Sequence, residues 1–399
     1  MRRRILQVFN RYVHMGGEEK SVDRIYRHLS EEHAMARCFF ESKDWTADDA
    51  PQKLGQLRRT WYNEESRAQF ERVCDEFQPD LALFHNAFPV GSPSIYHAAH
   101  RRKLPVVHYV HNFRPFSVGG TLYARTGFLE EALRGNYIRE VQSGAWQGSK
   151  LKSAVMALVL QRLHRSGWLR QVKAWVCISD FLRDKLISGA GLPRENVFAL
   201  RHSWDALPQA PPPEDAGYYL FLSRLVEVKG VETVLQAWNA LEEQLGSRTP
   251  ELWIAGEGPL AGMVREATTW MPKVRYLGLI DGDWKQQVIR RCRAMLAPSL
   301  WWEPLGLVTY EAYDFGKPML AARSGGLSET VVHGQTGFLH TPGDVSALVD
   351  SVRQLESMSD DARTAMGAAG RDWLLANTSV AQWRNQFHEM LESALGMGG

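Results

Sequence analysis

The sequence has few cysteines and no long apolar run. Its four cysteines, Cys38, Cys74, Cys177 and Cys292, are scattered and form no C-x-x-C pair, which favours free thiols in a reducing compartment over disulfides or a zinc site. No stretch approaches the ~18 uncharged apolar residues of a membrane-spanning helix. The opening MRRRILQVFN has too short an apolar region for a secretory signal. We therefore expect a cytoplasmic protein whose first β-strand lies in this opening.

Net charge is also small, but it is unevenly distributed along the chain. The formal charge is +2, yet residues 1–200 carry 30 Lys and Arg against 21 Asp and Glu, and residues 201–399 carry 17 against 24. The basic excess is concentrated in 101–200, with 16 basic and 6 acidic residues mixed with Trp and Leu. This region is interpreted either as solvated helix faces or as a surface for an acidic acceptor or for anionic lipid on the inner face of the plasma membrane. No nucleic-acid motif accompanies the charge, so no nucleic-acid partner is expected.

The length of 399 residues favours two domains over one core. The stretch ALPQAPPPEDAG is rich in Pro, which cannot continue a helix or a central strand. We therefore predict an N-terminal domain over 1–205, a linker over 206–217 and a C-terminal domain over 218–379.

Short strand-like runs alternate with longer helix-like runs in both halves. LALFHN, PVVHYVHN and AWVCIS are strand-like in the first half, and YYLFLS, ELWIAG, VRYLGL, AMLAPS and PMLAAR in the second. VETVLQAWNALEEQL and DWKQQVIRRCRA are helix-like. This alternation predicts an α/β fold of two Rossmann-like domains, with parallel sheets facing across a cleft and ligands at the carboxyl ends of the strands.

Two loops carry features suited to anionic ligands. SRLVEVKG places Arg224 and Lys229 between a strand and a helix, where two cations could neutralise a diphosphate. HMGGEEKS places Gly16 and Gly17 before a helix, where glycine permits close backbone approach to a ligand. The simpler interpretations are solvated cations in the first loop and a plain turn in the second.

Three other segments have simpler structural interpretations. IAGEGPLAG contains G-x-G-x-x-A, but no acidic residue ends a strand ~20 positions later, as a dinucleotide-binding fingerprint requires, so a tight turn is expected. In DGDW, Asp283 is expected to cap a helix rather than bind a metal. His108 and His111 lie on opposite faces of a strand, which makes His108 structural and lets His111 face a substrate. No metal site or cofactor is predicted.

The stretch WWEPLGLVTYEA contains two glutamates separated by Gly306. Glu303 is expected in a loop, and Glu311 about one turn into the following helix, facing the same ligand. Because an ionised carboxylate only accepts hydrogen bonds, its partners are hydroxyls and cations. Together with Arg224 and Lys229, the pair predicts a ligand with two hydroxylated ends joined by phosphate, such as a nucleotide sugar.

These motifs, in this order, closely resemble the retaining family 4 glycosyltransferases of the GT-B class. The resemblance over 220–345 rests on SRLVEVKG, AGEGPL, YLG, APS, the glutamate-x7-glutamate signature EPLGLVTYE, SGGLSE and GQTGFL. The first half is similar through the Gly16–Gly17 loop, HNFR at 111–114 and CISDF at 177–181. The resemblance also implies that a last helix, about 380–399, packs back on the first domain.

The resemblance implies a donor site for a UDP- or GDP-sugar. Arg224 and Lys229 would bind the diphosphate and stabilise the charge that develops on the leaving nucleotide. Glu311 would bond the ribose hydroxyls, and Glu303 would bond a hydroxyl of the transferred sugar. Backbone N–H groups near Gly306 and Leu307 would contact sugar or phosphate.

The resemblance also assigns roles to the first domain. Gly16 and Gly17 would let their loop approach the phosphate, and His111 would contact the sugar near the reacting carbon. The long 111–150 segment is assigned to the acceptor, a glycan or a lipid-linked molecule of surface or exopolysaccharide or lipopolysaccharide biosynthesis. The implied reaction is metal-independent transfer with retention, in which a phosphate oxygen deprotonates the acceptor.

Two other functions fit the same architecture. A nucleotide-sugar epimerase would need a different acid–base set, so Arg224, Lys229 and the paired glutamates favour transfer. A non-catalytic nucleotide-sugar-binding module would keep the binding residues and lack turnover. Donor turnover without acceptor, or its absence, distinguishes these alternatives.

Overall fold

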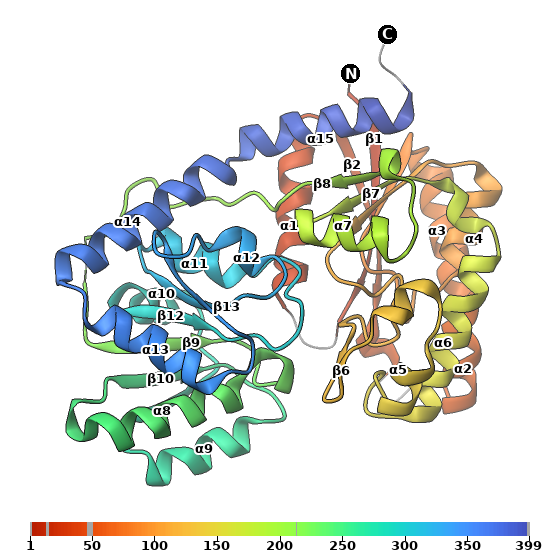
Figure 1. Cartoon of the computed structure of the whole chain (residues 1–399). Helices are drawn as coiled ribbons and strands as arrows, with labels where there is room; N and C mark the ends of the chain where they lie inside the picture. The colour runs from red at the N-terminus through yellow and green to blue at the C-terminus, as the bar shows by residue number, and fades with distance from the viewer. Residues whose placement is uncertain (1, 13–15, 46–50, 213, 397–399) are drawn as a thin grey trace. The chain divides into compact units, whose positions relative to one another are not determined.

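The computed structural model describes residues 2–12, 16–45, 51–212 and 214–396. The chain forms two compact units, each with its own six-stranded sheet (Figure 1). Unit 1 is Met1–His202 with Val380–Gly399, and unit 2 is Ser203–Ser379. The chain thus leaves unit 1 after His202, and the Pro-rich stretch 206–217 is assigned to unit 2.

The sheet of unit 1 is parallel throughout, with its strands in the order β2–β1–β3–β4–β7–β8. The strands β3 and β4 are buried along their whole length, as expected where helices cover both faces of a parallel sheet. The order reverses direction between β1 and β3, which marks the ligand-binding edge in such sheets. The strand bounds are β1 Arg4–Arg11, β2 Ala34–Glu41, β3 Leu81–Phe84, β4 Val106–Val110, β7 Val172–Cys177 and β8 Val197–Ala199.

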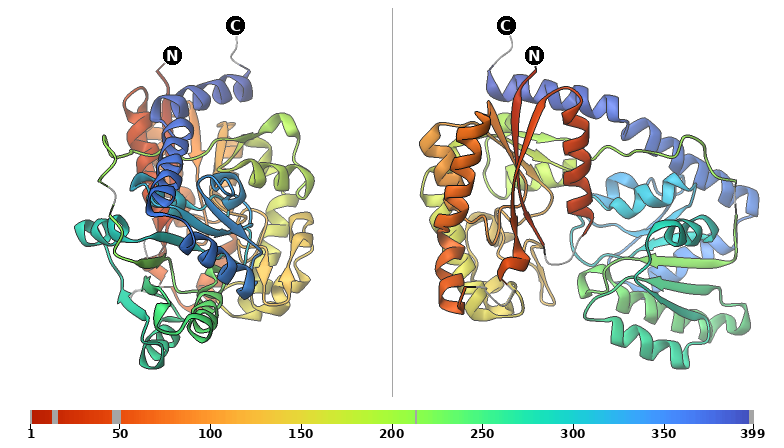
Figure 2. Two further views of the ribbon diagram at one scale, coloured as in Figure 1. Left: turned by 60° about the vertical axis from the view of Figure 1, so that its left-hand side comes forward. Right: turned by 180° about the vertical axis from the view of Figure 1, so that it is seen from behind.

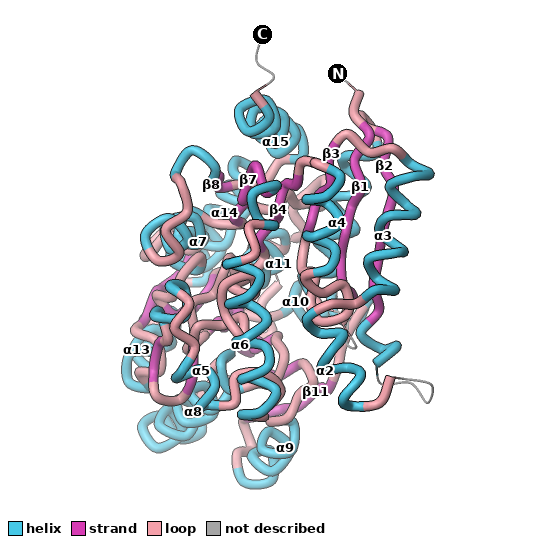
Figure 3. The backbone as a smooth tube through the Cα atoms, turned by 90° about the vertical axis from the view of Figure 1, so that its right-hand side faces the viewer, coloured by secondary structure: helices cyan, strands magenta, loops and turns pink. Residues whose placement is uncertain are grey.

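Helix α1 lies on one face of this sheet, and α3 and α4 lie on the other (Figure 2). Helices α2 and α6 pack against each other (Figure 3), and a hairpin of β5 (Tyr123–Ala124) and β6 (Gly127–Phe128) lies within the long 111–150 segment. The α-helix bounds are α1 Gly17–Ser30, α2 Lys53–Trp61, α3 Glu64–Phe77, α4 Ser94–Arg102, α5 Ile138–Ser143, α6 Lys150–Arg165 and α7 Asp180–Ser188; 3₁₀ turns span Ser42–Trp45, Glu130–Arg134, Trp168–Gln171 and Arg194–Asn196.

The last helix, α15 (Val380–Leu395), belongs to unit 1 although it follows unit 2 in the chain. It packs on α1 and β7. The buried Trp383 donates its indole N–H to the hydroxyl of Tyr109 at 3.2 Å, and Arg384 pairs with Glu31 at 2.5 Å. Among the described helices, none has both the length and the apolar content needed to cross a bilayer.

The sheet of unit 2 is also parallel, in the order β11–β10–β9–β12–β13–β14. Its direction reverses between β9 and β12, so the loops that follow these two strands meet at the expected ligand-binding edge. The bounds are β9 Tyr218–Leu222, β10 Glu251–Ala255, β11 Val274–Gly278, β12 Ala294–Ala297, β13 Met319–Ala322, β14 Gly337–His340, α8 Val231–Leu245, α9 Ala261–Trp270, α10 Gly282–Arg291, α11 Leu307–Asp314, α12 Leu327–Thr330, α13 Val345–Glu356 and α14 Asp360–Asn377, with 3₁₀ turns at Glu227–Lys229 and Gly246–Arg248.

The fold therefore confirms the predicted α/β class, and each strand predicted from an apolar run is present. The strands β2, β8 and β14 and the hairpin β5–β6 were not predicted. One local prediction was wrong: Asp283 does not cap α10, because the helix begins at Gly282 and its N-cap residue is Asp281. Asp283 lies in the first turn instead, where a carboxylate interacts favourably with the helix dipole.

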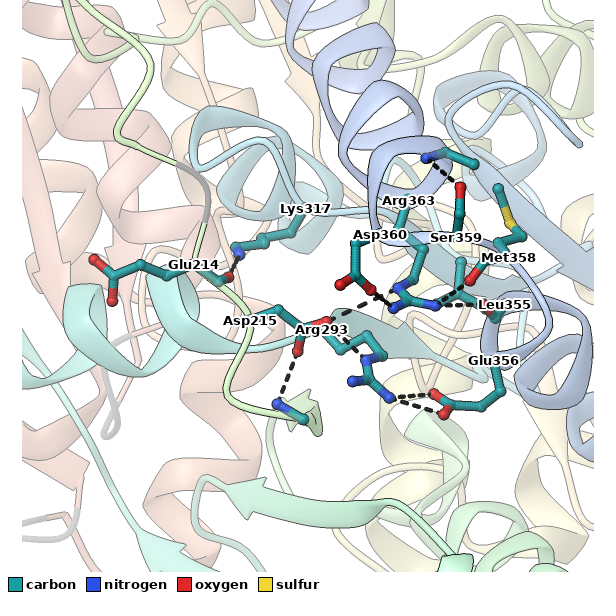
Figure 4. A network of polar contacts seen from close by, with 12 residues as sticks. Glu214, Asp215, Arg293, Lys317, Leu355, Glu356, Met358, Ser359, Asp360 and Arg363 are labelled. Atoms are coloured by element: carbon teal, nitrogen blue, oxygen red, sulfur yellow. Dashed lines mark hydrogen bonds and ion pairs between the residues drawn. The ribbon is translucent and has the colours of Figure 1, made fainter.

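The end of the Pro-rich stretch is attached to unit 2 by charged side chains (Figure 4). Asp215 pairs with Arg293 at 2.8 Å, and Arg293 also pairs with Glu356 at 2.8 Å. The Lys317 ammonium donates to the backbone carbonyl of Glu214, whose carboxylate pairs with Arg290 at 2.7 Å. These contacts fix the entry of the chain into β9.

The beginning of the same stretch is held by the buried carboxylate of Asp314 at the end of α11. Asp314 accepts hydrogen bonds from the indole N–H of Trp204 at 2.9 Å and the backbone N–H of Leu207 at 2.8 Å, and it pairs with Arg371 at 3.0 Å. The backbone N–H of Trp204 donates to the Thr378 carbonyl at 2.9 Å. The segments by which the chain enters and leaves unit 2 are therefore bonded to each other.

We predict that Asp314→Ala destabilises unit 2 strongly, because it leaves the Arg371 guanidinium buried without its counter-ion. The loss in free energy of unfolding should be about 3–5 kcal/mol. The control is Arg275→Ala, which removes an exposed pair with Glu251 and should cost about 1 kcal/mol or less. Urea denaturation, with hydrogen exchange to follow the amides of unit 2, measures both; equal small losses would show that Asp314 is not the anchor.

Candidate functional site

The loops after β9 and β12 touch each other at the carboxyl edge of the unit 2 sheet. The Leu300 N–H donates to the Val228 carbonyl at 2.9 Å. Gly230, at φ +76°, approaches so closely that an added Cβ would lie 2.1 Å from the Pro298 carbonyl oxygen. Only glycine fits this position, and the close approach brings the side chains of the two loops together.

Lys229 and Glu303 form an ion pair across these two loops. The Lys229 Nζ lies 2.9 Å from Glu303 Oε1 and 2.7 Å from Oε2. The Ser299 hydroxyl and the Trp301 indole N–H also donate to Oε2, at 2.9 and 3.0 Å. The lysine and glutamate side chains are 17% and 12% exposed, so the pair is largely withdrawn from water while remaining accessible to a ligand.

A glycine pair after β13 holds the backbone of Glu303 in place. The Gly326 N–H donates to the Glu303 carbonyl at 2.7 Å. A Cβ on Gly325, at φ +56°, would lie 2.3 Å from the same oxygen, and a Cβ on Gly326 would lie 2.6 Å from the Leu305 Cα. Gly325 and Gly326 of SGGLSE therefore pack directly against the backbone of the loop that contains Glu303.

Glu311 lies on α11, which begins at Leu307 immediately after Gly306 at φ +88°. Its Oε1 accepts from the Lys285 ammonium at 2.6 Å, and the two side chains are 24% and 21% exposed. Lys285 comes from α10 and was not predicted as a site residue. Arg224, in contrast, is exposed, and none of the described acidic side chains pairs with it.

The glycines of AGEGPL support the loop that carries Arg224. A Cβ on Gly256 would lie 1.8 Å from the Ser223 carbonyl oxygen, and one on Gly258 would lie 2.4 Å from the Leu225 carbonyl oxygen. The Leu225 N–H donates to the Glu257 carbonyl at 2.9 Å. The G-x-G sequence is therefore a close-packed turn after β10, as predicted.

In unit 1, Gly16 and Gly17 lie at the start of α1, with Gly16 as the N-cap residue. Residues 13–15 of the same loop lie outside the described residues. In the described part of the chain, no atom lies within 4 Å of where a Cβ on Gly16 would be. The adjacent Glu18 accepts from the Tyr12 hydroxyl at 3.0 Å and from the Asn112 amide at 3.1 Å, which ties the start of α1 to the loop after β4.

His111 follows β4 directly and is buried among other rings. Its Nε2 lies 2.8 Å from His85 Nδ1, and its ring stacks on those of Tyr109 and His202 with centroids 5.2 Å away. Burial lowers the pKa of His111 to about 3, so its imidazole is neutral at physiological pH. His108 points elsewhere, bonding the Tyr96 hydroxyl at 2.9 Å and stacking on Trp175.

Unit 1 also contains a pocket of about 670 Å³. Its lining includes the aromatic side chains of Trp45, Phe88 and Trp146, together with Arg114, whose guanidinium lies 4.9 Å from the Trp146 ring centroid. Part of the wall comes from the 111–150 segment and part from α6. Flat aromatic faces beside a cation suit a ligand with both apolar and polar surface.

One group of described residues, Glu32, His33 and His388, has ligand atoms close enough to share a metal ion. However, the backbone N–H of Arg3 donates to His33 Nδ1 at 3.3 Å, which places the His33 proton on Nε2. That nitrogen lies 3.0 Å from His388 Nε2, so a hydrogen bond accounts for the contact. Glu32 and His33 precede β2, at the opposite edge of the sheet from His111, and His388 lies on α15.

The chain matches two family models. Residues 203–373 match "Glycosyl transferases group 1", and residues 15–202 match "Glycosyltransferase Family 4". The two matches together cover most of the chain. The chain belongs to the family 4 glycosyltransferases.

This glycosyltransferase is similar in sequence to several curated proteins over part of its length. It is 30% identical over 234 residues to glycogen synthase of Mycobacterium tuberculosis, covering 54% of this chain and 55% of that protein. It is 31% identical over 173 residues to the GDP-mannose-dependent alpha-(1-6)-phosphatidylinositol monomannoside mannosyltransferase of the same organism, covering 41% and 43%. The chain thus spans about half the length of these relatives or less.

The fold is similar to that of solved structures over nearly the whole chain. The structure of Anabaena HepE in complex with UDP-glucose gives a TM-score of 0.69 at 17% identity, with 98% of this chain and 99% of that chain covered. This likeness and the two parallel sheets confirm the predicted GT-B fold.

We predict that Gly325→Ala is much more damaging than Gly334→Ala. Both glycines have positive φ, but no atom of the described residues lies within 4 Å of a Cβ on Gly334, whereas a Cβ on Gly325 overlaps the Glu303 carbonyl. Both variants incur the cost of a left-handed alanine, about 1–2 kcal/mol, and Gly325→Ala should lose a further ~1–3 kcal/mol through overpacking. Chemical denaturation of both variants measures this difference; equal losses would show that the glycine does not support the Glu303 loop.

Proposed function

We propose that this family 4 glycosyltransferase transfers a hexose-type sugar from a UDP- or GDP-sugar to a hydroxyl of a glycan or lipid-linked acceptor, with retention of anomeric configuration. The observation that carries the proposal is the Lys229–Glu303 ion pair, with Glu311 on the adjoining helix, at the carboxyl edge of the unit 2 sheet. HepE in complex with UDP-glucose and the GDP-mannose-dependent relative support a nucleoside diphosphate sugar as donor.

The cations of unit 2 suit the diphosphate. Lys229 and the exposed Arg224 flank the loop after β9, and the N–H groups at the start of α11 add partial positive charge. Charge that develops on the leaving phosphate would be stabilised by these groups. Because they already supply positive charge, the proposed reaction needs no metal.

The carboxylates suit the hydroxyl groups at either side of the diphosphate. Glu303 would accept from a hydroxyl of the transferred sugar and Glu311 from the ribose. In the structure these carboxylates pair with Lys229 and Lys285. Donor binding would therefore exchange protein ion pairs for protein–ligand contacts rather than bury new uncompensated charges.

Retention is proposed to proceed on one face of the sugar, without a covalent intermediate on Glu303. The Glu303 carboxylate accepts from Lys229, Ser299 and Trp301 at 3.0 Å or less. Three donors disperse its negative charge and make it a weak nucleophile. In the proposed step, the bond from the anomeric carbon to the phosphate oxygen breaks, the acceptor oxygen bonds to that carbon, and the acceptor proton passes to the departing phosphate.

The aromatic pocket of unit 1 is the proposed acceptor site. Trp45 and Trp146 offer faces on which a sugar ring can pack, and Arg114 offers charged N–H donors. The buried Glu140 organises the segment behind Arg114 by accepting from the backbone N–H of Val118 at 2.8 Å and from the Ser117 hydroxyl.

The proposal is tested by incubating the chain with UDP-, GDP- and ADP-sugars, glycan or lipid-linked acceptors, and either magnesium or a chelator. Proton NMR of the product reads the anomeric configuration directly. A glycoside of unchanged configuration, formed equally with the chelator, is expected. A sugar of altered ring configuration without acceptor would instead identify an epimerase, and nucleotide binding without turnover would identify a binding module.

We predict that Lys229→Ala weakens binding of the nucleoside diphosphate and lowers kcat together. Loss of one charge-assisted contact should cost about 1.5–3 kcal/mol in donor affinity. The matched control is Lys273→Ala, because Lys273 precedes β11 at the opposite edge of the same sheet. Calorimetry and initial rates measure both variants; if the two behave alike, Lys229 is not in the donor site.

We also propose that α6 contacts an anionic membrane surface. Leu151 and Leu158 are 69% and 46% exposed and lie on one stripe of the helix, seven residues apart. Exposed Lys150, Lys152 and Arg162 accompany them, and the helix contains no acidic residue. Apolar side chains among cations are typical of helices that lie on anionic lipid.

We expect the chain to bind phosphatidylglycerol vesicles in a salt-sensitive way and phosphatidylcholine vesicles weakly. Replacing both Leu151 and Leu158 with Gln should reduce vesicle binding at least about tenfold, because each buried CH₂ contributes ~0.8 kcal/mol. The control replaces Leu279 and Leu375, which are 75% and 47% exposed on unit 2, with Gln in the same way. Co-sedimentation measures vesicle binding. If both double variants lost vesicle binding equally, α6 would not be the membrane-contacting helix.

A further inference from the structure

Three buried side chains of unit 1 form a hydrogen-bonded chain that ends at His111. Gln7 on β1 lies 3.1 Å, through its Nε2, from His85 Nε2. His85, directly after β3, lies 2.8 Å through Nδ1 from His111 Nε2. Gln7 and His85 are fully buried, and His111 is 8% exposed. The chain thus runs from the middle of β1, through the residue that follows β3, to the residue that follows β4 at the ligand-binding edge of the sheet.

The direction of the hydrogen bonds follows from the carbonyl of Val22. Gln7 Nε2 lies 2.9 Å from this carbonyl oxygen. If the Gln7 amide were flipped, its oxygen would face the Val22 carbonyl oxygen, and two acceptors would meet. Gln7 therefore presents N–H groups to both Val22 and His85. His85 Nε2 must accept, so the His85 proton is on Nδ1 and is donated to His111 Nε2. His111 is left with its own proton on Nδ1.

The surroundings keep both imidazoles neutral. Burial lowers the pKa of His85 well below its usual value and the pKa of His111 to about 3. Among the described residues, the other titratable or charged groups around them are His108, His202, Tyr109, Arg24 and Arg37. None of these is a carboxylate that would favour an imidazolium ion.

The Nδ1 atom of His111 is buried, and within the described residues it has no hydrogen-bond partner. The Tyr109 and His202 rings restrict rotation of the imidazole. A buried N–H donor without a partner is costly unless a ligand satisfies it. Gln7 Oε1 also lacks a partner among the described residues, but Gln7 is completely buried, whereas His111 is 8% exposed at the ligand-binding edge. His111 Nδ1 is therefore the unpartnered atom of the hydrogen-bonded chain on the side of the substrate.

We propose that Gln7 and His85 are positioning residues that hold His111 as the neutral Nδ1–H tautomer, so that it donates a hydrogen bond to an oxygen of the transferred sugar. This inference rests on the proposed function. It narrows the donor class to sugars that present a hydroxyl or another neutral oxygen to His111 Nδ1–H. An amino sugar with an ammonium group there would meet a donor instead of an acceptor.

Histidine-selective ¹⁵N labelling and two-bond ¹H–¹⁵N correlation of the full chain test the tautomer directly. The His111 signal, assigned by its loss in His111→Asn, is expected in the Nδ1–H form from pH 5 to 8. His85→Leu removes the donor to Nε2 and should shift His111 toward the Nε2–H form. A wild-type His111 that is protonated on Nε2, or charged at pH 7, would overturn the inference.

Kinetic measurements distinguish a role of His85 in positioning His111 from a role in packing alone. In His85→Asn the side-chain amide can replace Nδ1–H, so kcat should stay within about threefold of wild type, whereas His85→Leu should lower kcat at least about tenfold with little change in affinity for the free nucleotide. The control is His108→Leu, which removes another buried histidine, on the neighbouring strand β4, and should leave kcat within about threefold of wild type. Equal losses in His85→Asn and His85→Leu would overturn the positioning role.

The two proposals fail in different ways. An active transferase with His111 in the Nε2–H form overturns the hydrogen-bonded chain alone. A protein with His111 in the Nδ1–H form that transfers no sugar overturns the proposed function, while the tautomer assignment stands.

Discussion

The ion pair between Lys229 and Glu303 is the interaction on which the candidate site of unit 2 depends. It joins the loops after β9 and β12 at the point where the strand order reverses. A pair this far from water stabilises the fold only if its remaining lone pairs are satisfied. Ser299 and Trp301 meet this requirement by donating to the carboxylate.

Glycines make this arrangement possible. Gly230 brings the two loops together, and Gly325 and Gly326 bring the segment after β13 against the backbone of Glu303. Each contact is so close that any Cβ would overlap a backbone atom. The side chains that would bind donor are therefore held by backbone packing on a rigid sheet, which limits the reorganisation needed when a ligand binds.

In unit 1, the buried polar groups at the carboxyl edge of the sheet are neutral imidazoles, whereas the site of unit 2 contains paired ions. Its carboxyl edge contains His85, His111 and His202, and burial lowers the pKa of each. Such groups are tolerated in the interior because each ring can be both donor and acceptor. The result is a set of directional hydrogen bonds without net charge beside the aromatic pocket.

Much of this could be predicted from the sequence because the signals are local. Continuous apolar runs such as LALF and YYLFL predicted the central strands, and the spacing around Gly306 predicted that Glu303 lies in a loop and Glu311 on a helix. β2 was missed because AMARCFFE mixes charged and apolar residues at an edge of the sheet. Asp281 and Asp283 are both plausible caps in sequence, and only the backbone geometry shows that Asp281 precedes the helix.

The partners of the site residues could not be predicted, because they come from elements far apart in the chain. Nothing local links Lys285 to Glu311, Gly325 to Glu303, or Gln7 and His85 to His111. These contacts arise from strand order, which places the ends of β1, β3 and β4 side by side. The sequence indicated which residues have useful chemistry, and the topology determines which of them meet.

The most direct test of the central claim is calorimetry on Glu303→Gln with two ligands, a nucleoside diphosphate and the corresponding nucleotide sugar. If Lys229 binds the diphosphate and Glu303 binds the sugar, affinity for the nucleoside diphosphate should be unchanged or tighter, because Lys229 loses its competing partner. Affinity for the nucleotide sugar should fall by at least about tenfold, or ~1.4 kcal/mol. Equal weakening of both ligands would contradict the assignment of Glu303 to the sugar.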